Sequence, residues 1–255
     1  MGFSLRKWYL DCVSDDGEAI VGYRAELRWE ALALHYASIL HQDGENPPRV
    51  RSTLRRCPAP AEKSGEINWE APPLELSGTW QALAPAFSTA LFEGHEGNVL
   101  WRCQQPRARA QVRLPSGRKV EGLGYVEELI VTVPPWHLPI EQLRWGRFAS
   151  ARSGLVWIDW RGPHPLRLAL VDGKPVELGA AGEERVEAGG LSLHLSAPAV
   201  LRSGRIGGTA LSVIPGVERI FPLRVLGLEE TKWRSRGTLG ADPGWAIHEV
   251  VRWPR

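Results

Sequence analysis

Residues 120–133, VEGLGYVEELIVTV, decide the fold, and they run directly into PPWHLPIEQLRWGRF, which ends at residue 148. A period of two makes the first stretch a β-strand, whose odd-numbered positions form its most apolar face. Glu127 lies in the middle of that face, two residues after Tyr125. The odd-numbered face consists of Leu123, Tyr125, Glu127, Leu129, Val131 and Val133. We therefore expect any active site of this chain to lie on this strand.

A carboxylate on an apolar face needs a proton, a partner or a ligand, because burying it charged and alone is very costly. A Glu in that position can act as a general acid near neutral pH. The alternative is that Glu127 forms a structural ion pair with one of the arginines. Glycines at 122 and 124 predict a bulge, a bend or the close approach of another group, and a bulge could exchange the roles of Glu127 and Glu128.

The composition is that of an ordinary globular protein, with 43% hydrophobic and 24% charged residues among 255. The formal net charge of +2 does not favour a polyanion-binding surface, so nucleic acid is not an expected partner. The 12 tryptophans, 27 glycines and 20 prolines indicate many short elements with broad apolar sheet faces. The tryptophans are expected to pack the core or, alternatively, to line a ligand cavity.

Several classes of site are not indicated by the sequence. Cys12, Cys57 and Cys103 are odd in number and far apart, which argues against a disulfide framework and a structural zinc. Nucleotide-binding glycine loops, HExxH and GxSxG are missing, so we expect no cofactor and no metal. The N-terminal residues lack the apolar segment of a signal peptide, and no run is long enough for a transmembrane helix. We therefore expect a cytoplasmic protein without an integral membrane segment.

The period-two pattern recurs along most of the chain. SDDG at 14–17 and LPSG at 114–117 predict turns between antiparallel neighbours. About fifteen or more strands, including segments at 205–214 and 220–226, predict an all-β protein, while residues 81–92 are undecided. That many strands exceed one small barrel, and prolines at 134, 135 and 139 lie near the middle of the chain. We therefore predict domains at 1–135 and 136–255.

Other polar side chains also fall on apolar strand faces. Asp159 lies between Trp157 and Arg161, and Glu249 lies between Ile247 and Val251. In a closed barrel such groups could converge on a cavity, whereas on the outer face they would be solvated or would bridge the two halves. Trp145 and Arg147 are candidates for an aromatic wall and a fixed cation of a substrate site.

Three motifs carry a family resemblance. They are Gly122-x-Gly124-Tyr125-x-Glu127, Leu138-Pro139-Ile140-Glu141 and Leu143-x-Trp145-Gly146-Arg147. Together they resemble the core of the hydroxyneurosporene synthase (carotenoid 1,2-hydratase) and AttH-like group, which has a GxGYxD stretch followed by PLE-like and W-S-R-like segments. Trp101 and the alternating strand at 108–114 also fit, so the resemblance covers roughly residues 99–150. Here Glu127 replaces the aspartate, Gly146 replaces the serine, and the chain is short for the group.

The resemblance implies two consecutive lipocalin-like antiparallel β-barrels, with a ligand cavity near the tyrosine and the acid. Hydratases of the group add water to an isoprenoid double bond by acid catalysis without a redox cofactor, and related proteins cyclise or rearrange polyenes. By analogy, Glu127 would donate the proton, Tyr125 would orient it, and Trp101 or Trp145 would stabilise the cation. Fold-level analogy does not establish function.

Two functions are therefore expected from the sequence. The first is a cofactor-independent hydratase, isomerase or cyclase acting on a hydrophobic small molecule. The second is a non-catalytic lipocalin-like carrier or scaffold for an apolar ligand. A cavity that opens onto Glu127 would favour the enzyme, and a filled barrel with Glu127 paired to arginine would favour the second function. Neither the substrate nor the oligomeric state follows from the sequence.

Overall fold

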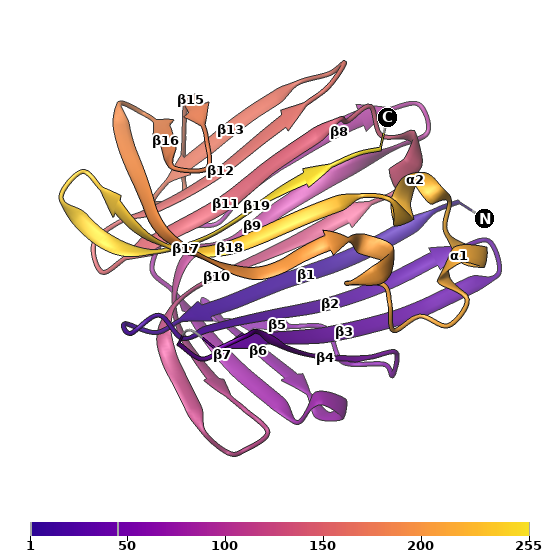
Figure 1. The fold of residues 1–255 in the computed structure, drawn as a ribbon, viewed down its shortest axis with the longest axis horizontal. Helices are drawn as coiled ribbons and strands as arrows, with labels where there is room; N and C mark the ends of the chain where they lie inside the picture. The colour runs from indigo at the N-terminus through magenta and orange to yellow at the C-terminus, as the bar shows by residue number, and fades with distance from the viewer. Residues whose placement is uncertain (1, 45, 255) are drawn as a thin grey trace. The chain divides into compact units, whose positions relative to one another are not determined.

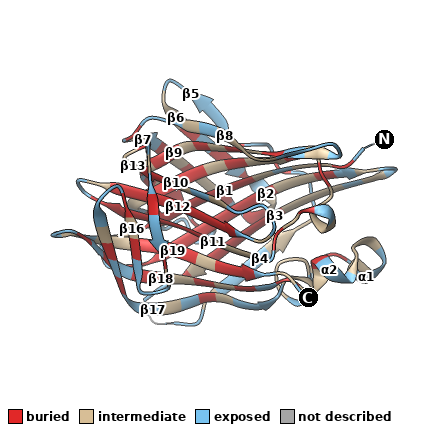
Figure 2. Cartoon of the chain, turned by 90° about the horizontal axis from the view of Figure 1, so that it is seen from above, coloured by how far each residue is buried: buried red, intermediate tan, exposed pale blue. Residues whose placement is uncertain are grey.

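The computed structural model describes residues 2–44 and 46–254, and the chain divides into two compact units, Met1–Pro134 and Pro135–Arg255. Each unit contains one antiparallel β-sheet, and the prediction of an all-β protein is confirmed. Side chains alternate between buried and exposed along many strands of both sheets, as Figure 2 shows. This alternation is the period-two pattern of the sequence, because successive side chains of a strand point to opposite faces.

The first unit holds a ten-stranded sheet in the order β4-β3-β2-β1-β10-β9-β7-β6-β5, with β8 paired to β9 (Figure 1). Its elements are β1 (Ser4–Val13), β2 (Ala19–Trp29), β3 (Leu32–Gln42), β4 (Arg49–Thr53), β5 (Ala61–Lys63), β6 (Glu66–Ala71), η1 (Pro72–Leu74), β7 (Leu76–Ala82), β8 (Phe87–Gly94), β9 (Gly97–Arg113) and β10 (Lys119–Val131). The predicted turns at 14–17 and 114–117 join β1 to β2 and β9 to β10. The undecided segment at 81–92 contributes the end of β7 and most of β8.

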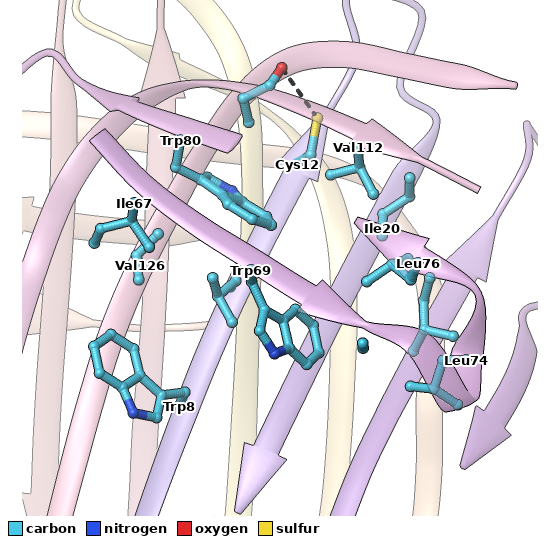
Figure 3. Packing of buried hydrophobic residues seen from close by; sticks show 14 of the residues in the cluster. Trp8, Cys12, Ile20, Ile67, Trp69, Leu74, Leu76, Trp80, Val112 and Val126 are labelled. Carbon is cyan, nitrogen blue, oxygen red and sulfur yellow. Dashed lines mark hydrogen bonds between the residues drawn. The ribbon is translucent and has the colours of Figure 1, made fainter. Parts of the chain in front are cut away.

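The core of the first unit shows that its sheet curls on itself. Residues from β1, β2 and β3 share one buried cluster with residues from β6, β7 and β9, strands from the other side of the sheet order. Trp8, Trp69 and Trp80 are the large side chains of this cluster (Figure 3). Burial of such indoles removes a large apolar area from water and stabilises the curled sheet. The first barrel is thus packed inside by tryptophans.

The second unit holds a nine-stranded sheet in the order β14-β13-β12-β11-β19-β18-β17-β16-β15. Its elements are η2 (Pro135–His137), β11 (Gln142–Ser150), β12 (Gly154–Arg161), β13 (Leu166–Val171), β14 (Lys174–Val176), β15 (Leu178–Ala181), β16 (Arg185–Ala188), β17 (Leu191–Arg205), η3 (Ile206–Gly208), α1 (Val217–Ile220), α2 (Leu223–Leu226), β18 (Glu229–Leu239) and β19 (Asp242–Arg252). Phe148, Leu155 and Trp157 pack against side chains of β15, β16 and β17, so this sheet also curls around a core.

The strands predicted at 205–214 and 220–226 are wrong. Residues 206–226 form turns, η3, α1 and α2 instead. Apolar residues in this segment, including Ile206, Phe221 and Val225, pack against Val251 and Trp253. Pro215 and Pro222 interrupt any regular strand ladder. Among the described residues, no helix is long and apolar enough to cross a membrane.

Candidate functional site

The centre of the candidate site is the middle of β10, which lies between β1 and β9. The pairing with β1 is continuous and places Tyr9 opposite Glu127. The pairing with β9 shifts between Gly124 and Val126 and again between Val126 and Glu127, because β9 has extra residues there. The bulge therefore lies on β9, and β10 keeps its alternation. Tyr125 and Glu127 remain on one face of the sheet.

Gly124 allows β1 and the barrel core to come close to this point of β10. A Cβ at residue 124 would lie 2.2 Å from the carbonyl oxygen of Asp11 and 3.0 Å from the Trp80 ring. The same carbonyl accepts a hydrogen bond of 2.7 Å from Trp80 Nε1. Since Asp11 pairs with Tyr125 in the ladder, the core tryptophan fixes the backbone next to the site.

The Glu127 carboxylate is held by two neutral donors. Trp101 Nε1 donates to Glu127 Oε2 at 2.6 Å, and the Tyr125 hydroxyl donates to the same oxygen at 2.7 Å. Trp101 and Tyr125 are buried, whereas Glu127 is partly exposed. Because Oε2 already accepts two hydrogen bonds, a proton on this carboxyl group belongs on Oε1.

Cys103 adjoins Tyr125 and Glu127, and burial keeps both Cys103 and Tyr125 protonated. Burial raises the pKa of Tyr125 well above its usual value, and the neighbouring Cys103 and Glu127 raise it further. Burial also raises the pKa of the Cys103 thiol well above its usual value, partly offset by its hydrogen bond with Tyr125. Tyr125 is therefore a hydrogen-bond donor, and Cys103 is not a thiolate nucleophile.

Aromatic rings surround the hydrogen-bonded group. The Tyr125 ring meets Tyr9 edge-on with centroids 5.9 Å apart, and Tyr9 meets Tyr23 in the same way at 5.4 Å. Phe87 of β8 lies 6.2 Å from the Trp101 ring. The electron-rich faces of such rings can stabilise a nearby positive charge. Neutral donors and aromatic rings are thus among the neighbours of the Glu127 carboxyl group.

Glu128 has a different environment from Glu127. Its side chain is only 1% exposed and forms ion pairs with Arg6 and with Arg102, the latter at 3.3 Å. Arg102 lies directly opposite Glu128 on β9. A buried carboxylate with two guanidinium partners serves the structure. Glu128 thus pairs with arginines of both neighbouring strands, Arg6 of β1 and Arg102 of β9.

Three of the predicted site residues lie on one face of β11 and β19 in the second unit. Trp145 pairs directly with Glu249, and Arg147 lies two residues further along β11. Lys232 of β18 is 1% exposed, forms an ion pair with Glu249, and places its Nζ 5.2 Å from the centre of the Trp145 ring. Arg147 is completely buried and donates to the carbonyl of Trp245 at 3.0 Å. Glu249 is thus the partner of a buried lysine.

Asp159 does not join this group. It pairs with Arg144 across β11, whereas Trp145 and Glu249 occupy the opposite face of the sheet. Its side chain is 6% exposed and forms an ion pair of 2.6 Å with Arg161. Asp159 and Glu249 therefore lie on opposite faces of the second sheet. The cause is the one-residue difference in register, which sends neighbours to opposite faces.

Sequence reasoning missed Cys103 and Lys232 as members of these clusters. Cys103 reaches the Glu127 face because of the β9 bulge, and Lys232 is opposite Glu249 only through the β18–β19 register. The sequence contains one signal for Lys232, namely a polar residue at a position that the period-two pattern makes buried. In the part of the chain that the structure describes, no three His, Cys, Asp or Glu side chains could together hold a metal ion.

Comparisons with known proteins rest on structure alone. No protein-family model and no curated protein matches the sequence. An AttH protein from Nitrosomonas europaea superposes with a TM-score of 0.58 at 8% identity, covering 98% of this chain and 92% of that chain. CghA with Sch210972 superposes with 0.56 at 11% identity, covering 98% and 88%. Kievitone hydratase from Nectria haematococca superposes with 0.51 at 11% identity, covering 99% and 89%.

At such low identities these matches show the fold. The chain consists of two consecutive lipocalin-like antiparallel β-barrels, as predicted, and its likeness to AttH-type structures extends over nearly its whole length. The motif resemblance covers roughly residues 99–150, so the structural likeness is much more extensive than the likeness in sequence. What the chain does depends on the side chains of its own site.

Proposed function

We propose that this protein is an acid-catalysed hydratase, isomerase or cyclase that acts on a hydrophobic, isoprenoid- or polyene-like small molecule, with Glu127 as the acid. One observation carries the proposal. Glu127 is held by the neutral donors Trp101 and Tyr125 among aromatic rings, while the adjacent Glu128 is neutralised by Arg6 and Arg102. Of the two carboxyl groups, Glu127 is the one that accepts hydrogen bonds from a buried tryptophan and a buried tyrosine, and we assign it as the acid.

The proposed reaction begins with proton transfer from Glu127 Oε1 to one carbon of a double bond. The π-electron pair forms the new C–H bond, and a positive charge develops on the neighbouring carbon. Water then adds to the cation and loses a proton, or an adjacent carbon loses a proton, which gives the hydrated or isomerised product. In a cyclisation, a second double bond of the substrate attacks the cation, and the new cation that this forms loses a proton. In each case a proton leaves, and Glu127 in its carboxylate form accepts it. This reaction needs no redox step.

Trp101 and Tyr125 are positioning residues in this scheme. Both donate to Oε2, which fixes the carboxyl plane and directs Oε1 to the substrate. Their hydrogen bonds also stabilise the carboxylate that remains after proton transfer. The rings of Trp101, Phe87 and Tyr9 offer π faces to the developing cation. The names of the structural neighbours fit the proposal, since one is a hydratase, and its substrate class is not assumed for this chain.

The test is turnover by the Glu127→Gln variant. Gln keeps a carbonyl oxygen that can accept from Trp101 and Tyr125, but it has no acidic proton. We expect intact folding and a loss of turnover by about 10²- to 10⁴-fold, the usual contribution of a general acid. Small apolar molecules that co-purify with the protein, identified by mass spectrometry, define the polyene panel to be assayed. Turnover in D₂O should place one deuterium on the protonated carbon.

Glu128→Gln is the matched control for this experiment. It makes the same chemical change one residue away and removes charge from the pair with Arg6 and Arg102. We expect it to lower the free energy of unfolding by about 1 to 2 kcal/mol, because the two arginines left behind are half exposed and stay solvated, and to retain turnover while folded. Wild-type turnover in Glu127→Gln would contradict the assignment of Glu127 as the general acid.

A non-catalytic carrier or scaffold is the second candidate. The observation in its favour is the tryptophan-packed interior of the first barrel, where Trp8, Trp69 and Trp80 occupy space that a barrel could use for a ligand (Figure 3). In that case Glu127 serves only to satisfy the buried donors Trp101 and Tyr125. Tight binding of a co-purifying apolar molecule, with no conversion of it by the wild type, would favour this candidate.

A further inference from the structure

A second polar site lies in the second unit, in a cleft of about 650 Å³ between β11, β12 and β13 on one side and β15 and β16 on the other. Four arginines and one aspartate provide the charges of its lining, namely Arg144, Arg161, Arg167, Arg185 and Asp159. The volume is in the range of small-molecule sites. Residues 179–182 form one wall, and their sequence GAAG leaves that wall without long side chains.

The strand register brings the charges together. Arg144 pairs with Asp159 on the neighbouring strand, and Asp159 pairs with Arg167 on the next, so the three lie in one row on the same face. Neighbouring strands are about 4.8 Å apart, which places the two arginines on either side of Asp159 within reach of one small group. This arrangement results from the β-ladder and is not an accident of long surface side chains.

The ion pairs leave two of these arginines available to a ligand. Arg161 is occupied, because it binds the buried Asp159 at 2.6 Å. Arg185 binds Glu187 at 2.8 Å. Arg144 has a loose ion pair of 3.9 Å with Glu183 and a long hydrogen bond of 3.5 Å to Gln142 Oε1, although its side chain is just 18% exposed. Arg167 makes no ion pair or side-chain hydrogen bond with any of the residues 2–44 and 46–254.

The guanidinium group of Arg144 is also poorly solvated. Burial lowers the pKa of Arg144 from its usual value, and the nearby Arg161 lowers it further, while Glu183 and Asp159 partly compensate. A guanidinium in this position gains more from an added anion than an exposed one does, because less water screens the interaction. The cleft thus holds Arg144, which is half-buried, and Arg167, which has no ion pair among the described residues. Asp159 lies between them and is already paired with Arg161.

We propose that this cleft binds the oxyanion of a small molecule, a carboxylate or a phosphate, with Arg144 and Arg167 as its direct partners. Planar guanidinium groups match both oxyanions through paired N–H···O hydrogen bonds. The small residues of the wall at 179–182 leave room for the rest of the ligand. The site is independent of the role of Glu127, because Glu127 belongs to the first unit and every residue of the cleft belongs to the second.

The test is isothermal titration calorimetry of the full chain with inorganic phosphate, benzoate and benzyl alcohol. We expect one site for phosphate or benzoate, an affinity that falls with added NaCl, and no binding of the uncharged alcohol. Stronger binding of phosphate would identify a phosphorylated ligand, and stronger binding of benzoate would identify a carboxylic acid. Binding of benzyl alcohol as tight as that of benzoate would overturn the proposal, because the site would then be apolar.

Charge-matched variants decide whether the cleft is the site. Arg167→Gln should weaken anion binding about tenfold, and Arg167→Gln combined with Arg144→Gln should weaken it further. Arg152→Gln is the control, because Arg152 is 75% exposed, lies outside the cleft and carries the same charge. It should change the affinity less than twofold. Equal affinity in wild type and Arg167→Gln, equal weakening by Arg152→Gln, or no anion binding below about 10 mM would each overturn the proposal.

Discussion

At the residue scale, two adjacent carboxyl groups of β10 have different partners: Glu127 accepts hydrogen bonds from Trp101 and Tyr125, and Glu128 pairs with Arg6 and Arg102. The period-two pattern placed Tyr125 and Glu127 on one face, and the structure agrees. Trp101 was singled out from a resemblance, but its bond to Glu127 depends on the β9 bulge. The arginine partners of Glu128 could not be assigned, because the choice among 31 basic residues depends on strand register.

His248 provides a residue-scale test of the second barrel. It is buried, stacks on Trp233 with ring centres 5.2 Å apart, and shares a hydrogen bond of 2.9 Å with Ser235. Its pKa is lowered from 6.5 to about 4, first by burial and then by the nearby Lys232, while Glu249 partly compensates. His248 therefore becomes protonated near pH 6.5 in the unfolded chain, but only near pH 4 in the folded chain.

His248 should consequently destabilise the fold as the pH falls. Its contribution to stability is complete above pH 6.5 and is lost between pH 6.5 and 4, which amounts to about 3 kcal/mol of unfolding free energy. Denaturant titrations of wild type and His248→Gln at pH 7 and pH 4 measure this difference. His194→Gln is the control, because His194 is exposed in the same unit. An identical pH dependence in wild type and His248→Gln would refute the assignment.

At the element scale, the strands were easier to predict than the connections. The turns at 14–17 and 114–117 were correct because Gly17 and Gly117 have the positive φ angles that such turns need. Residues 206–226 were mispredicted as strands, since short apolar runs do not distinguish a strand from a helical turn. What decided their structure was packing against Val251 and Trp253, which are distant in sequence.

Gly124 gives the element-scale prediction. Gly124→Ala would place a Cβ 2.2 Å from the backbone oxygen of Asp11, so β1 and β10 must separate or Trp80 must move. We expect a loss of about 2 to 3 kcal/mol in the free energy of unfolding, typical of overpacking. Gly208→Ala is the control, because no atom lies within 4 Å of its added Cβ. Equal stability of the two variants in denaturant titrations would contradict the close approach at Gly124.

At the scale of the whole molecule, the two sheets are separate hydrogen-bonded systems. The strands of the first sheet lie between Ser4 and Val131, and those of the second lie between Gln142 and Arg252. The count of strands and the prolines near residue 135 suggested such a division from sequence, whereas the order of strands within each sheet could not be read from a single chain. We propose that the domains predicted at 1–135 and 136–255 also unfold as separate units.

Hydrogen exchange of two glycine variants tests this proposal. Gly124→Ala strains the first sheet, and Gly146→Ala strains the second, because its Cβ would lie 2.2 Å from the Trp157 ring in the second core. Separate units open independently, so each variant should lower amide protection only in the strands of its own sheet. Loss of protection in both sheets from either variant would show a single cooperative unit, because strain in one sheet would then lower the free energy of opening everywhere.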